Sequence, residues 1–252
     1  YMVFFTDKAG TIFSVDEPEA FLSPRAISRR TKQGIAILPE DLPVNKTYID
    51  DVASTGAEVY FKTKWMNGVL IQCDQSLLTT IRLLPFVQRI ERVAPGQKLI
   101  PNGRRKSAAR TKGTKTTEYT DDQLLMLGIP QWHEQEFRGE GMNIAVFDSG
   151  FSGVDDGVPF EDLFTDNRIL LTTDFVFNTP DVYQYDDHGT AVLSVIGAYQ
   201  QDVFTGGAHQ STFQLYVTED VASEYRIEEY NWLFAAERAD SAGVDIINSS
   251  LG

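Results

Sequence analysis

Cysteine is almost absent from this sequence of 252 residues, in which Cys73 is the only one. A disulfide within the chain is therefore excluded. Cys73 ends the alternating run VLIQC, where it shares a strand face with Val69 and Ile71. This position predicts a small core residue. The alternative is a reactive or metal-binding thiol.

Long apolar runs are also missing. No stretch approaches the roughly 18 to 20 apolar residues of a membrane-spanning helix, so no membrane partner is expected. The chain opens directly on the strand-like run YMVFFT, without a basic and then apolar leader, so a signal peptide is presumed to have been removed. Hydrophobic residues nevertheless make up 42% of the chain, which predicts folded cores.

Positive charge is scarce in the second part of the chain. Residues 1–118 contain 18 Lys and Arg against 12 Asp and Glu, whereas residues 119–252 contain 4 against 24. An acidic surface repels phosphate, so nucleic acid is not an expected partner. Two interpretations are open. The opposite charges favour association of the two parts of the chain, or the acidic surface only keeps the protein soluble.

Basic residues gather in the segment PNGRRKSAARTKGTK, which has no apolar periodicity and no interleaved aromatic residue. It predicts an exposed linker over residues 98–118, between a domain at 1–97 and a second at 119–252. Exposed polar linkers are preferred sites of proteolysis. We therefore expect maturation cleavage between Pro95 and Glu118.

The first domain alternates strand, helix, helix, strand, strand, helix, strand, which predicts a small α+β domain. The segments, in order, are YMVFFT, FLSPRAISRRTKQGI, NKTYIDDVAST, AEVYFKTKW, GVLIQCD, SLLTTIRLL and VQRIERV. The first helix has both ends marked, with Ser23 as N-cap, Pro24 at the first helical position and Gly34 as C-cap.

The second domain has a different pattern. Nearly continuous apolar strands, MNIAVFD, FQLYVTED and VDIINSS, alternate with the helical segments HGTAVLSVIGAY and IEEYNWLFAAERADSAG. This alternation predicts an α/β domain with a parallel sheet covered on both faces. Chemistry in such sheets gathers at the carboxyl ends of the strands.

Three features lie where chemistry is expected in such a sheet. Asp148 ends the strand IAVFD, and His188 begins a helix 40 residues later. The third strand runs out into Ser250, Leu251 and Gly252. Taken singly, these features are more simply explained as a helix cap, a surface histidine and an ordinary strand-to-loop transition.

Together they resemble the subtilisin-like serine peptidases of family S8, whose triad follows the chain order Asp, His, Ser. The resemblance lies in IAVFDSGF, DDHGTAVLSVIGA, GGAHQSTFQLYVTED and DIINSSLG. It implies the first half of a subtilisin-like α/β domain in residues 119–252, preceded by a ferredoxin-like inhibitory propeptide. FLSPRAISRR and DLPVN resemble secreted members of Bacteroidetes-type bacteria, which implies an extracellular or periplasmic protein.

The resemblance also implies roles for individual residues. Asp148 would orient His188, which would take the proton of the nucleophile and later donate it to the leaving amine. Polypeptide substrates, and the protein's own propeptide, would lie in the cleft as an added strand. The residues implied for the two walls of this cleft are Ser250, Leu251 and Gly252 on one side and Ser223, Glu224 and Tyr225 on the other.

The nucleophile is the point of departure from the family. Its GTSxA-type motif and its oxyanion-hole asparagine have no counterpart in these residues, and neither Ser149 nor Ser152 opens a helix. We therefore expect serine endopeptidase activity of the full-length protein but not of this part alone. The alternative is a non-enzymatic pseudopeptidase, or a propeptide acting as inhibitor and folding chaperone. A nucleotide-binding domain is disfavoured because MNIAVFDSGFSG lacks GxGxxG.

No cofactor is required for this chemistry, but calcium is common in the family. The acidic segment VDDGVPFEDLFTDN, expected to be a loop, supplies oxygen ligands of suitable hardness. A structural calcium ion and a solvated acidic loop are both open, and no residue is assigned as a metal ligand. The acidic residues of the segment are Asp155, Asp156, Glu161, Asp162 and Asp166.

Overall fold

The computed structural model describes residues 1–95 and 119–251, without the side chains of residues 119–121. The chain divides into two compact units, each with a sheet of its own. The first unit consists of Tyr1–Leu99 with Ser223–Gly243, and the second of Ile100–Ala222 with Val244–Gly252. The predicted domain boundaries at residues 97, 98 and 118 lie outside the described residues.

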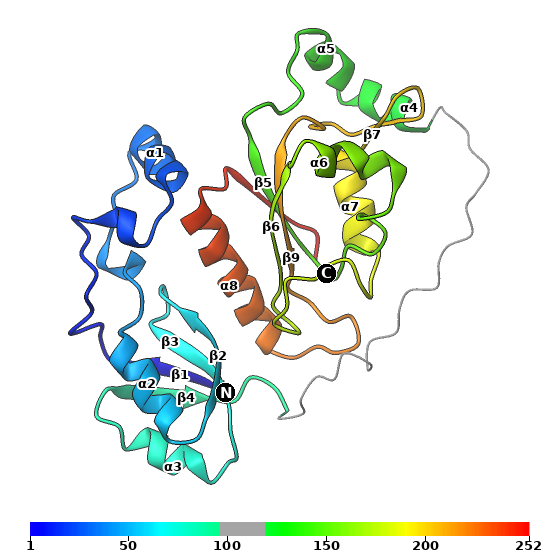
Figure 1. Cartoon of the computed structure of the whole chain (residues 1–252). Helices are drawn as coiled ribbons and strands as arrows, with labels where there is room; N and C mark the ends of the chain where they lie inside the picture. Colours follow the sequence, from blue (N-terminus) through cyan, green and yellow to red (C-terminus); the bar gives the residue numbers. More distant parts are fainter. Residues whose placement is uncertain (96–118, 252) are drawn as a thin grey trace. The chain divides into compact units, whose positions relative to one another are not determined.

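The first unit contains a four-stranded antiparallel sheet in the order β2-β3-β1-β4 (Figure 1). This confirms the predicted α+β domain and its order of elements. The strands are β1 (Met2–Phe5), β2 (Glu58–Thr63), β3 (Gly68–Gln72) and β4 (Val87–Glu91). The helices are α1 (Pro24–Gln33), α2 (Lys46–Ser54) and α3 (Leu77–Arg82), with 3-10 turns η1 (Pro18–Ala20) and η2 (Pro39–Asp41).

Helix α1 begins and ends at the predicted residues. The Ser23 hydroxyl accepts a hydrogen bond from the Ala26 amide at 3.1 Å, and Pro24 is the first helical residue. Gly34 ends the helix in the left-handed conformation, with φ of 67°. A side chain is strained in that conformation, which explains the glycine.

Cys73 packs beside the core of this unit. It is half-buried against a cluster that includes Val69 and Ile71, as the alternation predicts. Burial raises the pKa of its thiol, so the thiolate that a reactive or metal-binding cysteine needs is disfavoured. The geometry therefore favours the core residue over the reactive thiol.

Helix α8 (Ile227–Ala242) belongs to the first unit although it lies far along the chain. It packs on the sheet through aromatic rings. Phe234 lies 5.2 Å from the ring of Phe61 on β2, and Tyr230 lies 6.3 Å from the ring of Phe4 on β1. The sequence predicted this helix, but not that it would be grouped with the N-terminal sheet.

The second unit contains a parallel sheet in the order β10-β5-β9-β6 (Figure 1). This confirms the predicted parallel sheet, and the covering of both its faces stays a prediction. Its strands are β5 (Asn143–Asp148), β6 (Ile169–Asp174), β9 (Thr212–Val217) and β10 (Ile246–Ser249). Also present are α4 (Tyr119–Met126), α5 (Ile129–Glu134), η4 (Val158–Phe160), α6 (Glu161–Thr165), α7 (His188–Gly197) and the hairpin of β7 (Tyr199–Gln200) and β8 (Phe204–Thr205).

Helix α7 packs on this sheet through a shared core that includes Leu193, Val146 and Phe213. The approach is close at the end of the helix, where a Cβ on Gly197 would stand 2.5 Å from the Phe213 ring. Only glycine allows this contact. The packing fixes α7 relative to β5 and β9, and thereby fixes the first residue of α7, His188.

Two parts of the second unit differ from expectation. The acidic segment predicted as a loop is partly helical, because it contains η4 and α6. Strand β6 was not predicted, because it is an edge strand whose Leu170 is exposed and its sequence ILLTTD is not continuously apolar. Exposed edge strands lack the apolar pattern of central parallel strands.

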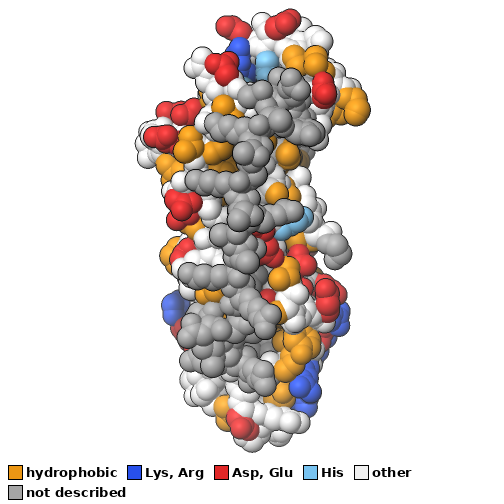
Figure 2. Space-filling view, turned by 90° about the vertical axis from the view of Figure 1, so that its right-hand side faces the viewer, with side chains coloured by type: hydrophobic (Ala, Val, Ile, Leu, Met, Phe, Trp, Pro, Cys, Tyr) orange, Lys and Arg blue, Asp and Glu red, His pale blue; other side chains and the backbone are white. Residues whose placement is uncertain are grey.

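Acidic side chains are spread over one face of the molecule. Figure 2 shows Asp and Glu at many places on one face, with few Lys and Arg among them. This agrees with the net charge of −14.

Within residues 1–95 and 119–251, no helix combines the length and the apolar character that a membrane span requires.

Candidate active site

Asp148 is delivered to the edge of the sheet by a fully buried strand. It is the last residue of β5, whose six residues are all buried. Strands β9 and β10 flank β5 in parallel, with Val217 opposite Asp148 and Ser249 opposite Phe147. The carboxyl ends of three strands therefore meet at one edge, where ligands of parallel sheets bind.

The structure brings His188 onto Asp148. The Nδ1 atom of His188 lies 2.9 Å from Oδ1 and 3.1 Å from Oδ2 of the carboxylate. The Asp148 side chain is 0% exposed, whereas that of His188 is 55% exposed. A bond at Nδ1 fixes the ring and leaves Nε2 to exchange protons with another group.

The electrostatics of the pair follow from this geometry. The hydrogen bond and the negative charge of Asp148 raise the pKa of His188, and the charges of Asp186 and Glu219 add to this effect. Burial raises the pKa of Asp148, against the hydrogen bonds from His188 and Ser149. The arrangement therefore stabilises the imidazolium form of His188.

Two glycines allow the Asp148 turn and the start of α7 to touch. A Cβ on Gly189 would stand 2.5 Å from the Gly150 carbonyl oxygen and 2.9 Å from the Asp148 Cβ. A Cβ on Gly150 would stand 2.7 Å from the Asp186 carbonyl oxygen. A larger residue at either position would push Asp148 and His188 apart.

Sequence reasoning missed two residues of the site. Asp186 accepts hydrogen bonds from the amides of Asp187, at 2.7 Å, and His188, at 3.2 Å, just before α7. The Ser149 hydroxyl lies within hydrogen-bond distance of both Asp148 and Asp186. The available signal for Asp186 was an acid close to the start of a helix, where a negative charge is favoured.

The predicted cleft residues lie in both units. Ser250 and Leu251 follow β10, at the same sheet edge as Asp148, and the Ser250 hydroxyl lies 3.1 Å from Asn248 Oδ1. Gly252 lies outside the described residues. Ser223, Glu224 and Tyr225 precede α8 in the first unit, with Glu224 and Tyr225 exposed. The substrate-binding roles of all six residues stay predictions.

The acidic segment does not gather its carboxylates at one point. Among the described residues no group of three or more His, Cys, Asp or Glu side chains is arranged to hold a metal ion. The donor set that calcium prefers, six to eight oxygens around one point, is therefore not formed by these side chains. Structural calcium stays a prediction.

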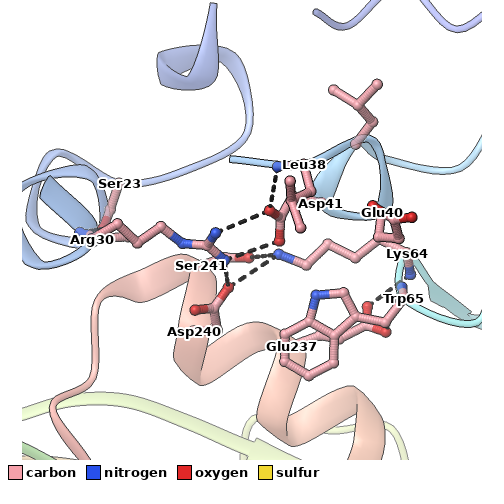
Figure 3. Close-up of polar contacts among 12 residues, drawn as sticks. Ser23, Arg30, Leu38, Glu40, Asp41, Lys64, Trp65, Glu237, Asp240 and Ser241 are labelled. Atoms are coloured by element: carbon pink, nitrogen blue, oxygen red, sulfur yellow. Dashed lines mark hydrogen bonds and ion pairs between the residues drawn. The ribbon is translucent and has the colours of Figure 1, made fainter. Parts of the chain in front are cut away.

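Within the first unit, α8 is joined to residues 1–95 by a charged cluster around Asp240 (Figure 3). Arg30 binds both oxygens of Asp41 at 2.9 Å and one oxygen of Asp240 at 2.7 Å. Arg29 also binds Asp240, and Lys64 donates to Ser241 at 2.8 Å. Asp41 thus orients the Arg30 guanidinium for its contact with α8.

A second acid of α8 binds the turn between β2 and β3. The buried Glu237 carboxylate accepts hydrogen bonds from the amides of Lys64, at 2.8 Å, and Trp65, at 3.1 Å (Figure 3). It also accepts one from the Thr63 hydroxyl. Burial raises the pKa of Glu237, and these donors oppose the shift. Glu237 and Asp240 therefore hold the N-terminal sheet and α1 on one helix.

Comparison with known families identifies the N-terminal part of the chain. Residues 1–112 match the family model described as "Peptidase S8 propeptide domain, Bacteroidota". No curated protein is similar enough to the chain to count as a match.

Several solved protease structures are similar to parts of this chain. One is a mutant of the epidermin leader peptide processing serine protease EpiP from Staphylococcus aureus. It is 14% identical, with a TM-score of 0.50 over 81% of this chain and 47% of that one. Fervidolysin from Fervidobacterium pennivorans, a keratinolytic enzyme related to subtilisin, is 15% identical, with a TM-score of 0.47 over 82% and 34%. The MycP3 protease of the type VII (ESX-3) secretion system is 21% identical, with a TM-score of 0.43 over 57% and 38%.

This chain spans less than half the length of each of these structures. The likeness to EpiP supports the fold, and the family model identifies the N-terminal part. The chain therefore has a subtilisin-like fold that is preceded by an α+β domain. The domain that precedes it matches the S8 propeptides of Bacteroidota over residues 1–112.

Proposed function

We propose that this chain is part of the precursor of a secreted serine endopeptidase that hydrolyses peptide bonds with a Ser-His-Asp triad. Asp148 and His188 supply two members, and a serine outside these residues supplies the third. The observation that carries the proposal is the 2.9 Å contact between His188 Nδ1 and the buried Asp148, at the carboxyl edge of a parallel sheet.

In this mechanism His188 moves the proton. Its Nε2 accepts the proton of the serine hydroxyl as the oxygen attacks the substrate carbonyl, and returns it to the amine as the peptide bond breaks. Asp148 holds the ring through Nδ1 and stabilises the imidazolium that forms. Ser149 does not fit the nucleophile, because it is buried and its hydroxyl is bound between two carboxylates.

We infer that residues 1–95 act as an inhibitor and folding chaperone for the remainder. The contacts of Glu237 and Asp240 with the N-terminal sheet and α1 favour this role, because they join the propeptide to a helix of the second sequence domain. Such a contact orders α8 while the propeptide is present. It also outlasts cleavage of the linker, so the inhibitor leaves slowly or after further proteolysis.

A fluorophosphonate reagent, which labels activated serines, tests the enzymatic proposal on the full-length gene product. We expect one labelled serine in a peptide that lies outside residues 1–252, and loss of the label in His188→Ala. Ser152→Ala is the matched control and keeps the label. A wild-type protein that takes no label after its propeptide has been removed would instead be a pseudopeptidase.

A further inference from the structure

The Ser149 hydroxyl lies between two carboxylates. Its Oγ is 3.2 Å from Oδ1 of Asp148 and 3.1 Å from Oδ2 of Asp186. A hydroxyl has one proton, so it donates to only one of these acceptors at a time. The choice affects His188, because Asp148 Oδ1 is also the nearer acceptor of His188 Nδ1.

The other partners of the two oxygens favour Asp186. Asp148 Oδ1 already accepts from the Ser149 amide at 2.8 Å and from His188 Nδ1 at 2.9 Å. Asp186 Oδ2 has Ser149 as its one hydrogen-bond donor among the described residues. The other oxygen of Asp186 accepts two amides at the start of α7, where a negative charge is stabilised.

The backbone holds Asp186 in this position. The Ser152 amide donates to the Asp186 carbonyl oxygen at 2.9 Å, and the Thr190 hydroxyl donates to the Ser152 carbonyl oxygen at 2.8 Å. Gly150 lies so close to Asp186 that a Cβ there would stand 2.9 Å from its amide nitrogen. The turn after β5 and the start of α7 are therefore clamped together around Ser149.

We propose that Asp186 is a positioning residue for the Asp148–His188 pair. Asp186 accepts the hydrogen bond of the Ser149 hydroxyl. Asp148 Oδ1 therefore keeps its full negative charge for the interaction with His188. The inference deepens the proposed function, since it concerns the same pair. The charged groups that act on His188 are then Asp148, which binds it directly, Asp186, which acts partly through Ser149, and Glu219, which acts through space.

The test is the pKa of His188, measured by NMR titration of its ring protons in the 252-residue chain. The chain has three histidines, so loss of one signal in His188→Gln assigns the resonance. Asp186→Asn keeps a side-chain oxygen for the amides at the start of α7 but removes the negative charge. We expect it to lower the pKa of His188 by about one unit, a tenfold change in proton affinity.

The Ser149→Ala background separates the two routes. In Ser149→Ala no hydroxyl is present to donate to Asp148 when Asp186 is replaced. In this background, Asp186→Asn therefore lowers the pKa of His188 by less than half as much. Ser149→Thr, which keeps a hydroxyl, retains the full effect. Glu219→Gln is the control, and its smaller effect is the same in both backgrounds. Non-additivity of this kind is the signature of coupling.

An equal effect of Asp186→Asn with and without the Ser149 hydroxyl overturns the inference. Thermal unfolding of each variant identifies any that fails to fold, and the threonine variant then supplies the comparison. The measurement is independent of peptide hydrolysis. A full-length protein without a reactive serine would contradict the proposed function but leave this titration intact.

Discussion

Asp148 and His188 form a hydrogen-bonded pair whose side chains differ in exposure, 0% and 55%. The buried acid is fixed by β5, and the exposed ring is fixed at one nitrogen only. A group that shuttles protons needs one fixed side and one accessible side. The pair has this property before any nucleophile is considered.

The stability of the chain should depend on pH through His188. The pKa of His188 is raised in the folded state, so the pair stabilises the fold fully below the unfolded value of about 6.5 and loses this effect as pH rises through the folded pKa. We expect wild type to exceed His188→Gln in free energy of unfolding at about pH 5.5, and the difference to vanish at about pH 9. Urea unfolding at both values measures it.

The same experiment in Asp148→Asn is the control. Without the carboxylate, the main cause that raises the pKa of His188 is gone. The difference in free energy of unfolding between Asp148→Asn and the double variant with His188→Gln should therefore depend much less on pH. A dependence as large as in the presence of Asp148 would mean that another group controls His188.

At the scale of single elements, α1 is defined by its own sequence. Ser23→Ala removes the acceptor of the Ala26 amide and should lower the free energy of unfolding by about 1 kcal/mol. Ser28, an exposed residue in the middle of the same helix, is the matched control. Ser28→Ala should be neutral or slightly stabilising, since alanine has the higher helix propensity. Equal losses in both variants would contradict the role of the cap.

The contact of α8 is defined by residues far apart in the chain. Asp240→Asn removes a charge that binds Arg29 and Arg30, and should cost about 2 to 3 kcal/mol of unfolding free energy. Asp50→Asn breaks an exposed pair with Lys46 on α2 and should cost less than about 0.5 kcal/mol. Fluorescence of Trp65 and Trp232 under urea reports both. Equal effects would mean that the cluster does not hold α8.

These two elements show what the sequence can and cannot predict. The ends of α1 depend on Ser23, Pro24 and Gly34, which lie within the helix or beside it, so local patterns sufficed. The bond between Arg30 and Asp240 joins residues 210 positions apart, which no local pattern encodes. Asp148 and His188 were predicted because their motifs are local, whereas Asp186 was missed because its bond to Ser149 depends on how two turns pack.

At the scale of the whole molecule, the basic segment between the two sequence domains should be the point of maturation. N-terminal sequencing of the mature protein should find a first residue between Pro95 and Glu118, because the segment is polar and rich in Lys and Arg. A mature start before Val93 would cut into the first sequence domain, at 1–97. A start beyond Met142 would remove the beginning of β5. Either result would contradict the predicted linker.

The central claim is that His188 and Asp148 perform peptide hydrolysis in the complete protein. The most direct measurement is kcat/KM for a peptide substrate with the matured full-length gene product. Asp148→Asn should lower it by about 10⁴-fold and His188→Ala by about 10⁶-fold, with folding unchanged. Hydrolysis that persists in His188→Ala at the wild-type rate would contradict the account.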